Sequence, residues 1–160
     1  MKGGFVAQKS LSRFGRLLLL TLWAAVALAA ERTSLEAQLD DLRQEATNAF
    51  AQVATERAAL KKKPDEKAQA ELWDRRSYWT HYMDLVIELR KTTAKMDLTP
   101  SLATRLAGAQ RALKATGVRV VTSGDGHVTL NPEPSSYADR ENALKSAAAA
   151  AVYTRLQPDR

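Results

Sequence analysis

A short polar break, KKKPDE at residues 61–66, divides two long stretches of helical periodicity. Before the break, small and large apolar residues recur at spacings of three and four, with Glu56 interrupting the series. These positions are Leu35, Leu39, Leu42, Ala46, Ala49, Val53 and Leu60. Such spacing predicts one apolar stripe along a helix. Because alanines thin the stripe in its middle, we expect the helix to need a partner for stability.

A second amphipathic helix is predicted from Asp65 to Met96. Its stripe consists of Leu72, Trp79, Tyr82, Val86, Leu89 and Met96, widened by Met83 and Ile87. Pro64 disfavours helix at the residue before it and suits the first turn of a new helix. Two helices of similar length joined by a short break favour an antiparallel helical hairpin. A single kinked helix that dimerises in parallel is the alternative.

The C-terminal part predicts a small α-β-β-α unit. Thr99 and Pro100 mark the start of its first helix, and Gly117 marks the end. The segments VRVV and HVTL flank the turn TSGDG and predict two short strands. Ser136 followed by Asp139 resembles a capping box and predicts a last, alanine-rich helix. Because two strands alone are marginal, we expect them to lie against the helices or to pair with another chain.

The order of elements from Leu106 to Ala151 resembles the helix–hairpin–helix part of BON domains and the start of OmpA-like periplasmic domains. The resemblance covers under a third of the chain and rests on a DG-x-V-T-L strand followed by an alanine-rich helix. The closing strand of a BON domain has no counterpart here, so no residue role is carried over. The layout of an apolar N-terminus followed by a coiled coil is similar to that of inner-membrane spanins of phages.

The N-terminal 30 residues have the composition of an export leader. Four cations, Lys2, Lys9, Arg13 and Arg16, precede an apolar run at residues 17–30, which ends in small residues with A-x-A spacing. These are the parts of a signal peptide. The run of 14 residues is shorter than the roughly 20 that a membrane-spanning helix needs. We therefore predict cleavage, with an uncleaved signal anchor as the alternative, and in both cases a body outside the cytoplasm.

Composition excludes several classes of function. The chain has no cysteine, which excludes disulfides, cysteine metal sites and a thiol nucleophile. The net charge of +6 comes mainly from the leader, which holds four of the 24 Lys and Arg residues and none of the 18 Asp and Glu residues. The remaining body is close to neutral, so we expect no nucleic-acid partner.

The sequence offers few candidates for chemistry. Ser123, Asp125 and His127 are close together, but turn formation explains these residue types in this order. The only histidines, His81 and His127, lie on different predicted elements, and we expect His81 to face solvent. The pairs Asp40/Asp41 and Asp65/Glu66 belong to solvated positions, where nothing separates their pKa values. We therefore predict no catalytic residue, no cofactor and no metal ligand.

The densest aromatic stretch, WDRRSYWTHYM at residues 73–83, suggests a partner-binding surface. Trp79 and Tyr82 fit the apolar stripe and are predicted to belong to the core of the hairpin. The other members, Trp73, Arg75, Arg76 and Tyr78, cannot all point inward on one helix. Trp, Tyr and Arg dominate binding hot spots, so we predict that these four residues bind a protein partner.

Together these features predict a mainly α protein in three parts: a signal peptide or signal anchor at 1–30, a helical hairpin or coiled coil at 31–97, and a small α-β-β-α head at 98–160. We expect a non-catalytic scaffold or chaperone-like protein of the bacterial envelope, in the periplasm, with a protein partner or self-association. The alternative is a single-pass inner-membrane component, spanin-like or part of a secretion machine, with membrane contact through residues 17–30.

Overall fold

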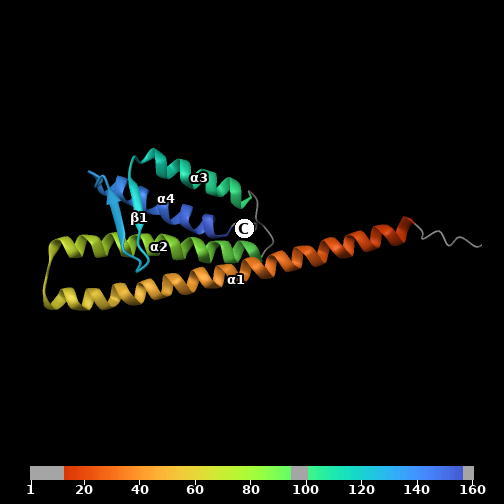
Figure 1. Ribbon diagram of the computed structural model, residues 1–160, viewed down its shortest axis with the longest axis horizontal. Coiled ribbons are helices and arrows are strands. Elements are labelled where there is room, and N and C mark those ends of the chain that lie inside the picture. Colours follow the sequence, from red (N-terminus) through yellow and green to blue (C-terminus); the bar gives the residue numbers. More distant parts are fainter. Residues whose placement is uncertain (1–12, 95–100, 157–160) are drawn as a thin grey trace, which may run out of the picture. The chain divides into compact units, whose positions relative to one another are not determined.

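The computed structural model describes residues 13–94 and 101–156, with side chains from Ala29 onward except that of Glu31. This part of the chain is mainly helical, with four helices and one two-stranded antiparallel sheet (Figure 1). The elements are α1 (Arg13–Lys62), α2 (Glu66–Ala94), α3 (Leu102–Ala115), β1 (Arg119–Thr122), β2 (Val128–Asn131) and α4 (Tyr137–Arg155). The chain divides into two compact units, Met1–Ser34 and Leu35–Arg160. All contacts described below lie in the second unit.

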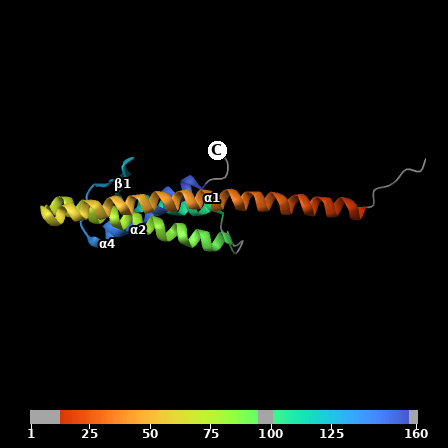
Figure 2. The ribbon, with the colours of Figure 1, turned by 90° about the horizontal axis from the view of Figure 1, so that it is seen from below.

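Helices α1 and α2 form an antiparallel hairpin within one chain. Asp40 of α1 pairs with Arg90 of α2, whereas Glu56, further along α1, pairs with Arg75, nearer the start of α2. The two helices lie side by side over this range in both ribbon views (Figures 1 and 2). The predicted hairpin is therefore confirmed, and the single kinked helix is not what the chain forms.

The seam of the hairpin follows the predicted apolar stripe. Leu39, Leu42, Ala46, Ala49 and Val53 on α1, and Trp79, Tyr82, Val86 and Leu89 on α2, are all buried. Leu35 packs half-buried against the same core, and Leu60 is also half-buried. Ile87 is 38% exposed, so the prediction that it widens the buried stripe is wrong. Met96 lies outside the described residues.

The C-terminal helices complete the same core. Helix α4 packs against α2, and α3 lies on the outer side of α4 (Figure 1). Ala143, Ala147 and Ala148 are buried on α4, and their small side chains let a neighbouring helix approach closely. Leu144 and Val152 join one continuous core with the hairpin seam. The hairpin and the C-terminal elements thus belong to one compact unit.

The predicted capping residues are found at the ends of the C-terminal helices, except at the start of α3. Ser136 accepts a hydrogen bond from the N–H of Asp139 at 3.1 Å and caps α4 as predicted. Gly117 follows α3 with a φ of 68°, a left-handed conformation that glycine adopts without strain. The N-cap of α3 is Ser101, which accepts from the N–H of Thr104. The prediction that Thr99 caps this helix and Pro100 opens it is therefore wrong, since α3 begins at Leu102; Thr99 and Pro100 themselves lie outside the described residues.

The two strands form a hairpin that lies against the helices, as expected. Each strand begins one residue later than predicted, with Val121 opposite Thr129 in the register. Val128 is 5% exposed and joins the core, and the sheet contacts α2 through β2 and α4 through β1. The sheet gains from the helices the packing that two isolated strands lack.

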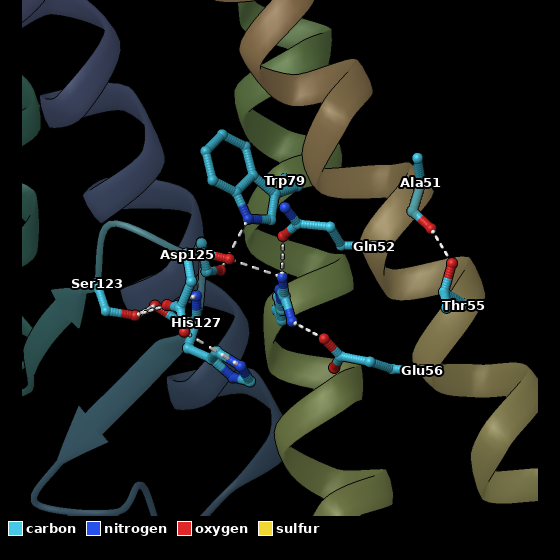
Figure 3. Close-up of polar contacts among 10 residues, drawn as sticks. Ala51, Gln52, Thr55, Glu56, Trp79, Ser123, Asp125 and His127 are labelled. Carbon is cyan, nitrogen blue, oxygen red and sulfur yellow. Dashed lines mark hydrogen bonds and ion pairs between the residues drawn. The ribbon is translucent and has the colours of Figure 1, made fainter.

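A buried arginine of α2, Arg75, joins the turn of this β-hairpin to α1. Figure 3 labels its partners Gln52, Glu56 and Asp125. The guanidinium of Arg75 donates to Glu56 at 2.7 Å and to Gln52 at 2.6 Å, both on α1. It also donates to the carbonyl oxygen of Asp125 at 2.8 Å. Because Arg75 is only 1% exposed, these acceptors replace the water that its charge would otherwise require. The interruption of the apolar stripe at Glu56 is thereby explained: its carboxylate is the counter-charge for Arg75.

The turn lies against α2, and its last position has a backbone conformation that favours glycine. Trp79 donates its indole N–H to the carbonyl oxygen of Gly126 at 3.1 Å. Gly126 has a φ of 81°, and a Cβ there would lie 3.5 Å from the indole nitrogen of Trp79 and 3.6 Å from the guanidinium of Arg75. The space is sufficient for a methyl group, so the left-handed backbone is the main constraint.

Replacing Gly126 by alanine is expected to lower the free energy of unfolding by about 1–2 kcal/mol, because an L side chain is strained at positive φ. Urea denaturation followed by circular dichroism measures this change. Gly124→Ala is the matched control, since nothing lies within 4 Å of a Cβ at that position of the same turn. Equal stability of the two variants would contradict the role given to the turn.

Arg75→Lys is expected to lower the free energy of unfolding by about 2–4 kcal/mol, because a single ammonium cannot satisfy three acceptors placed around a planar guanidinium. Arg76→Lys, at the neighbouring exposed position, should change it by less than about 0.5 kcal/mol. The comparison uses the same denaturation assay. A similar effect at both positions would show that Arg75 is not the connection between the elements.

Candidate functional site

Only two of the four predicted partner-binding residues lie on the surface. Trp73 is 37% exposed and Arg76 is exposed, whereas Arg75 and Tyr78 are 1% and 3% exposed. The expectation of one shared surface is corrected for Arg75 and Tyr78. Residues three apart share a helix face, so Arg75 and Tyr78 point inward together while Trp73 and Arg76 point outward.

The exposed indole of Trp73 is fixed by a second aromatic side chain. Its ring centroid lies 5.2 Å from that of Tyr137, at an interplanar angle of 55°. Tyr137 is the first residue of α4 and is 68% exposed. This tilted geometry is typical of favourable aromatic pairs. No local pattern predicts the pair, because α2 and α4 are brought together only by the fold.

Trp73 lies between two grooves. The first, which we call the tip groove, has a volume of about 430 Å³ and runs toward the α1–α2 connection. It is lined by Val53, Arg57, Leu60, Lys61, Pro64, Gln69, Leu72, Trp73 and Arg76. The second, the loop groove, measures about 380 Å³ and is lined by Ala70, Trp73, Pro134, Ser135, Ser136, Tyr137 and Arg140. One aromatic side chain thus borders two concave surfaces.

The cation of the loop groove is neutralised within the chain. Arg140 donates to both carboxylate oxygens of Asp74 at 2.6 Å and to Glu133 at 2.6 Å. The hydrogen bond to Asp74 is the main reason that the pKa of Arg140 is raised. The three cations that line the tip groove form no side-chain hydrogen bond or ion pair within the described part of the chain. The two grooves therefore differ in the charge that they offer.

A serine, a histidine and a carboxylate also meet near the start of α4. Glu141 accepts from Ser77 through one oxygen and contacts His81 at 2.8 Å through the other. In a hydrolytic triad the histidine lies between the nucleophile and the acid. Here the carboxylate takes that position, so the imidazole is not placed to receive the serine proton. His81 is half-buried against Glu141, and the prediction that it faces solvent is corrected.

The turn residues contact one another locally. Ser123 donates its hydroxyl to Asp125, and the N–H of His127 donates to the same carboxylate at 3.3 Å (Figure 3). All three side chains are exposed, and the contacts are those of a capped turn. Across residues 13–94 and 101–156, no cluster of three or more acidic or histidine side chains is arranged to hold a metal ion.

A third concave surface lies between α1 and the β-hairpin. This open cleft of about 600 Å³ is lined mainly by polar side chains, including Gln44, Asn48 and Gln52 at successive turns of α1. Tyr78 and Trp79 also line it, but they are 3% and 4% exposed. They offer little aromatic surface for stacking. The cleft therefore lacks the exposed anchor that Trp73 provides on the other side.

The chain matches no family model, no curated protein and no solved structure. The fold itself defines a mainly helical protein with a helical hairpin and a small two-stranded sheet. Among the described residues, none of the helices is both long enough and apolar enough to cross a membrane.

Glu141→Gln is expected to make stability less dependent on acid pH. Burial raises the pKa of Glu141, but the hydrogen bonds from Ser77 and His81 outweigh it, so the pKa lies below its ordinary value of 4.5. The ionised carboxylate thus stabilises the fold fully above pH 4.5, and this contribution disappears as the pH falls through the lowered pKa. The substitution should lower the free energy of unfolding by about 1 kcal/mol at neutral pH. The free energy of unfolding should then fall less steeply as the pH becomes acidic.

Urea denaturation at a series of pH values from neutral to acid measures both effects. Glu88→Gln is the control, because Glu88 is exposed on α2 and its side chain forms no hydrogen bond or ion pair within the described residues. If Glu141→Gln and the control lose the same free energy of unfolding as the pH falls, the contacts of Glu141 with Ser77 and His81 do not stabilise the fold.

Proposed function

We propose that this chain is an exported, non-catalytic envelope protein that binds another protein through the surface around Trp73 on its helical hairpin. The observation that supports this proposal is an exposed indole, fixed by Tyr137, between two grooves. Binding hot spots are enriched in Trp, Tyr and Arg beside well-packed pockets. Trp73, Arg76 and Tyr137 provide this combination.

The rigidity of the surroundings favours binding. Trp73 stands on a helix whose opposite face is buried in the core, and its ring is already packed. A side chain held in its bound position loses less conformational entropy on association. The surface is therefore suited to act as a preformed docking platform.

Export is supported by the charged and apolar leader at residues 1–30. The second candidate is a single-pass inner-membrane component that retains this leader as an anchor. One observation favours it: α1 begins at Arg13 and continues without a break past the expected cleavage position to Lys62. Intact mass and carbonate extraction of the envelope fraction distinguish the two. A start near Ala30 supports a free protein, and a start at Met1 in the carbonate-resistant fraction supports the anchor.

A photoreactive residue placed at Gln69 or at Ser135 samples the tip groove and the loop groove in the full chain in its own cells. At least one position is expected to give an ultraviolet-dependent adduct of defined mass that contains a second protein. Lys91 is the control, because it is exposed about 27 Å further along α2 from Trp73. Adducts no stronger at either groove than at Lys91 would refute the proposal.

Trp73→Ala with Arg76→Ala is expected to reduce the adduct at least about tenfold, as for hot-spot residues worth about 2 kcal/mol or more. The helical signal in circular dichroism should not change, because both side chains are exposed. Ile87→Ala with Lys91→Ala is the matched control, since Ile87 is 38% exposed on the same helix. A loss of helical signal in the first variant would show that these residues serve the fold instead.

A further inference from the structure

We infer that the tip groove receives an acidic amphipathic segment of the protein partner. This inference rests on the proposed function and adds the chemistry of the partner.

The floor of the tip groove is apolar. Val53 is 4% exposed, and Leu60 and Leu72 are half-buried beside it. Trp73 forms one wall. A volume of about 430 Å³ falls within the roughly 300–1,000 Å³ of ordinary binding pockets. The floor can therefore seat apolar side chains presented by one face of a helix or an extended segment.

The rim of the groove is positively charged. Arg57, Lys61 and Arg76 are all exposed and line the groove, and no acidic side chain lines it. These cations come from both α1 and α2, so they border the groove from two sides. A partner that enters the groove must place its flanking residues beside them.

Three of the four acidic residues near the tip are engaged elsewhere, and the fourth, Glu66, does not line the groove and forms no ion pair in the described part of the chain. Glu56 is paired with Arg75, and Glu71 lies 3.9 Å from Lys67. Asp65 accepts from the N–H of Ala68 at the start of α2. The rim cations are thus left without a counter-charge in the described part of the chain. Complementary charge on a partner would orient it and speed its association.

The concave shape favours a protein segment over a membrane surface. A bilayer takes up apolar side chains that protrude beyond the charged ones. Here the apolar floor lies more deeply buried than the exposed cationic rim. A protruding leucine or aromatic side chain flanked by Asp or Glu fits both features, whereas a flat lipid surface reaches only the rim.

A displayed library of random peptides tests the inference on the full chain. Peptides that bind the chain are recovered, and those that also bind the variant Arg57→Glu with Arg76→Glu are removed. The surviving peptides are expected to be net acidic with at least one large apolar residue. Their binding should weaken at least tenfold in this variant and should also weaken with added salt.

Arg43→Glu with Lys91→Glu is the control, because it makes the same charge change at exposed positions outside both grooves. Binding should be retained there. Arg57→Gln with Arg76→Gln, a milder change, should give an intermediate loss, and circular dichroism confirms that each variant is folded.

Neutral or basic surviving peptides, or equal loss in the control, would overturn the inference. So would vesicles containing phosphatidylglycerol that bind through Arg57 and Arg76 while no peptide survives, which would assign the groove to lipid. Failure of the proposed function is distinguished by photo-crosslinking. Adducts from Ser135 alone would keep the protein-binding role and exclude the tip groove, whereas adducts from neither groove would refute both.

Discussion

The buried guanidinium of Arg75 is the interaction on which the arrangement of the elements depends. It contacts α1 through Glu56 and Gln52 and reaches the turn between the two strands through the carbonyl of Asp125. A buried charge is costly unless it is paired and hydrogen-bonded. Both terminal nitrogens of Arg75 have such partners, whereas its buried Nε has none in the described part of the chain. The partners of Arg75 come from two separate elements, so the charge favours the one arrangement in which they converge. The apolar core alone is less selective, because hydrophobic contacts are not directional.

The ion pair between Arg75 and Glu56 also shapes the outer surface. Since Glu56 is engaged by Arg75, it does not neutralise the cations that border the tip groove. The inward orientation of Arg75 and Tyr78 turns Trp73 and Arg76 toward solvent. The proposed docking surface is therefore a consequence of how Arg75 is oriented and paired in the core. The same helix serves the fold with one face and offers an aromatic anchor with the other.

The two sides of the hairpin have different characters. Toward the β-hairpin, polar side chains line an open cleft in which the aromatic rings are buried. Toward the start of α4, an exposed aromatic pair borders two grooves, one neutralised by Asp74 and Glu133 and the other left positive. The second side combines apolar surface with uncompensated charge. This asymmetry is the reason for assigning the interaction to the surface around Trp73.

The sequence by itself determined the two long helices, most of their apolar stripes and the last helix cap, and it favoured the hairpin over a single kinked helix. Periodicity, Pro64 and the Ser136–Asp139 spacing act through nearby residues, which is why they can be read locally. Only the tertiary structure decided the burial of Arg75, since its acceptors lie 19, 23 and 50 residues away. Arginine is rarely buried without such partners, so a local pattern places it outside. The pairing of Trp73 with Tyr137 likewise depends on how α4 packs against α2. Contacts between distant segments arise only when the helices pack, and no local spacing encodes them.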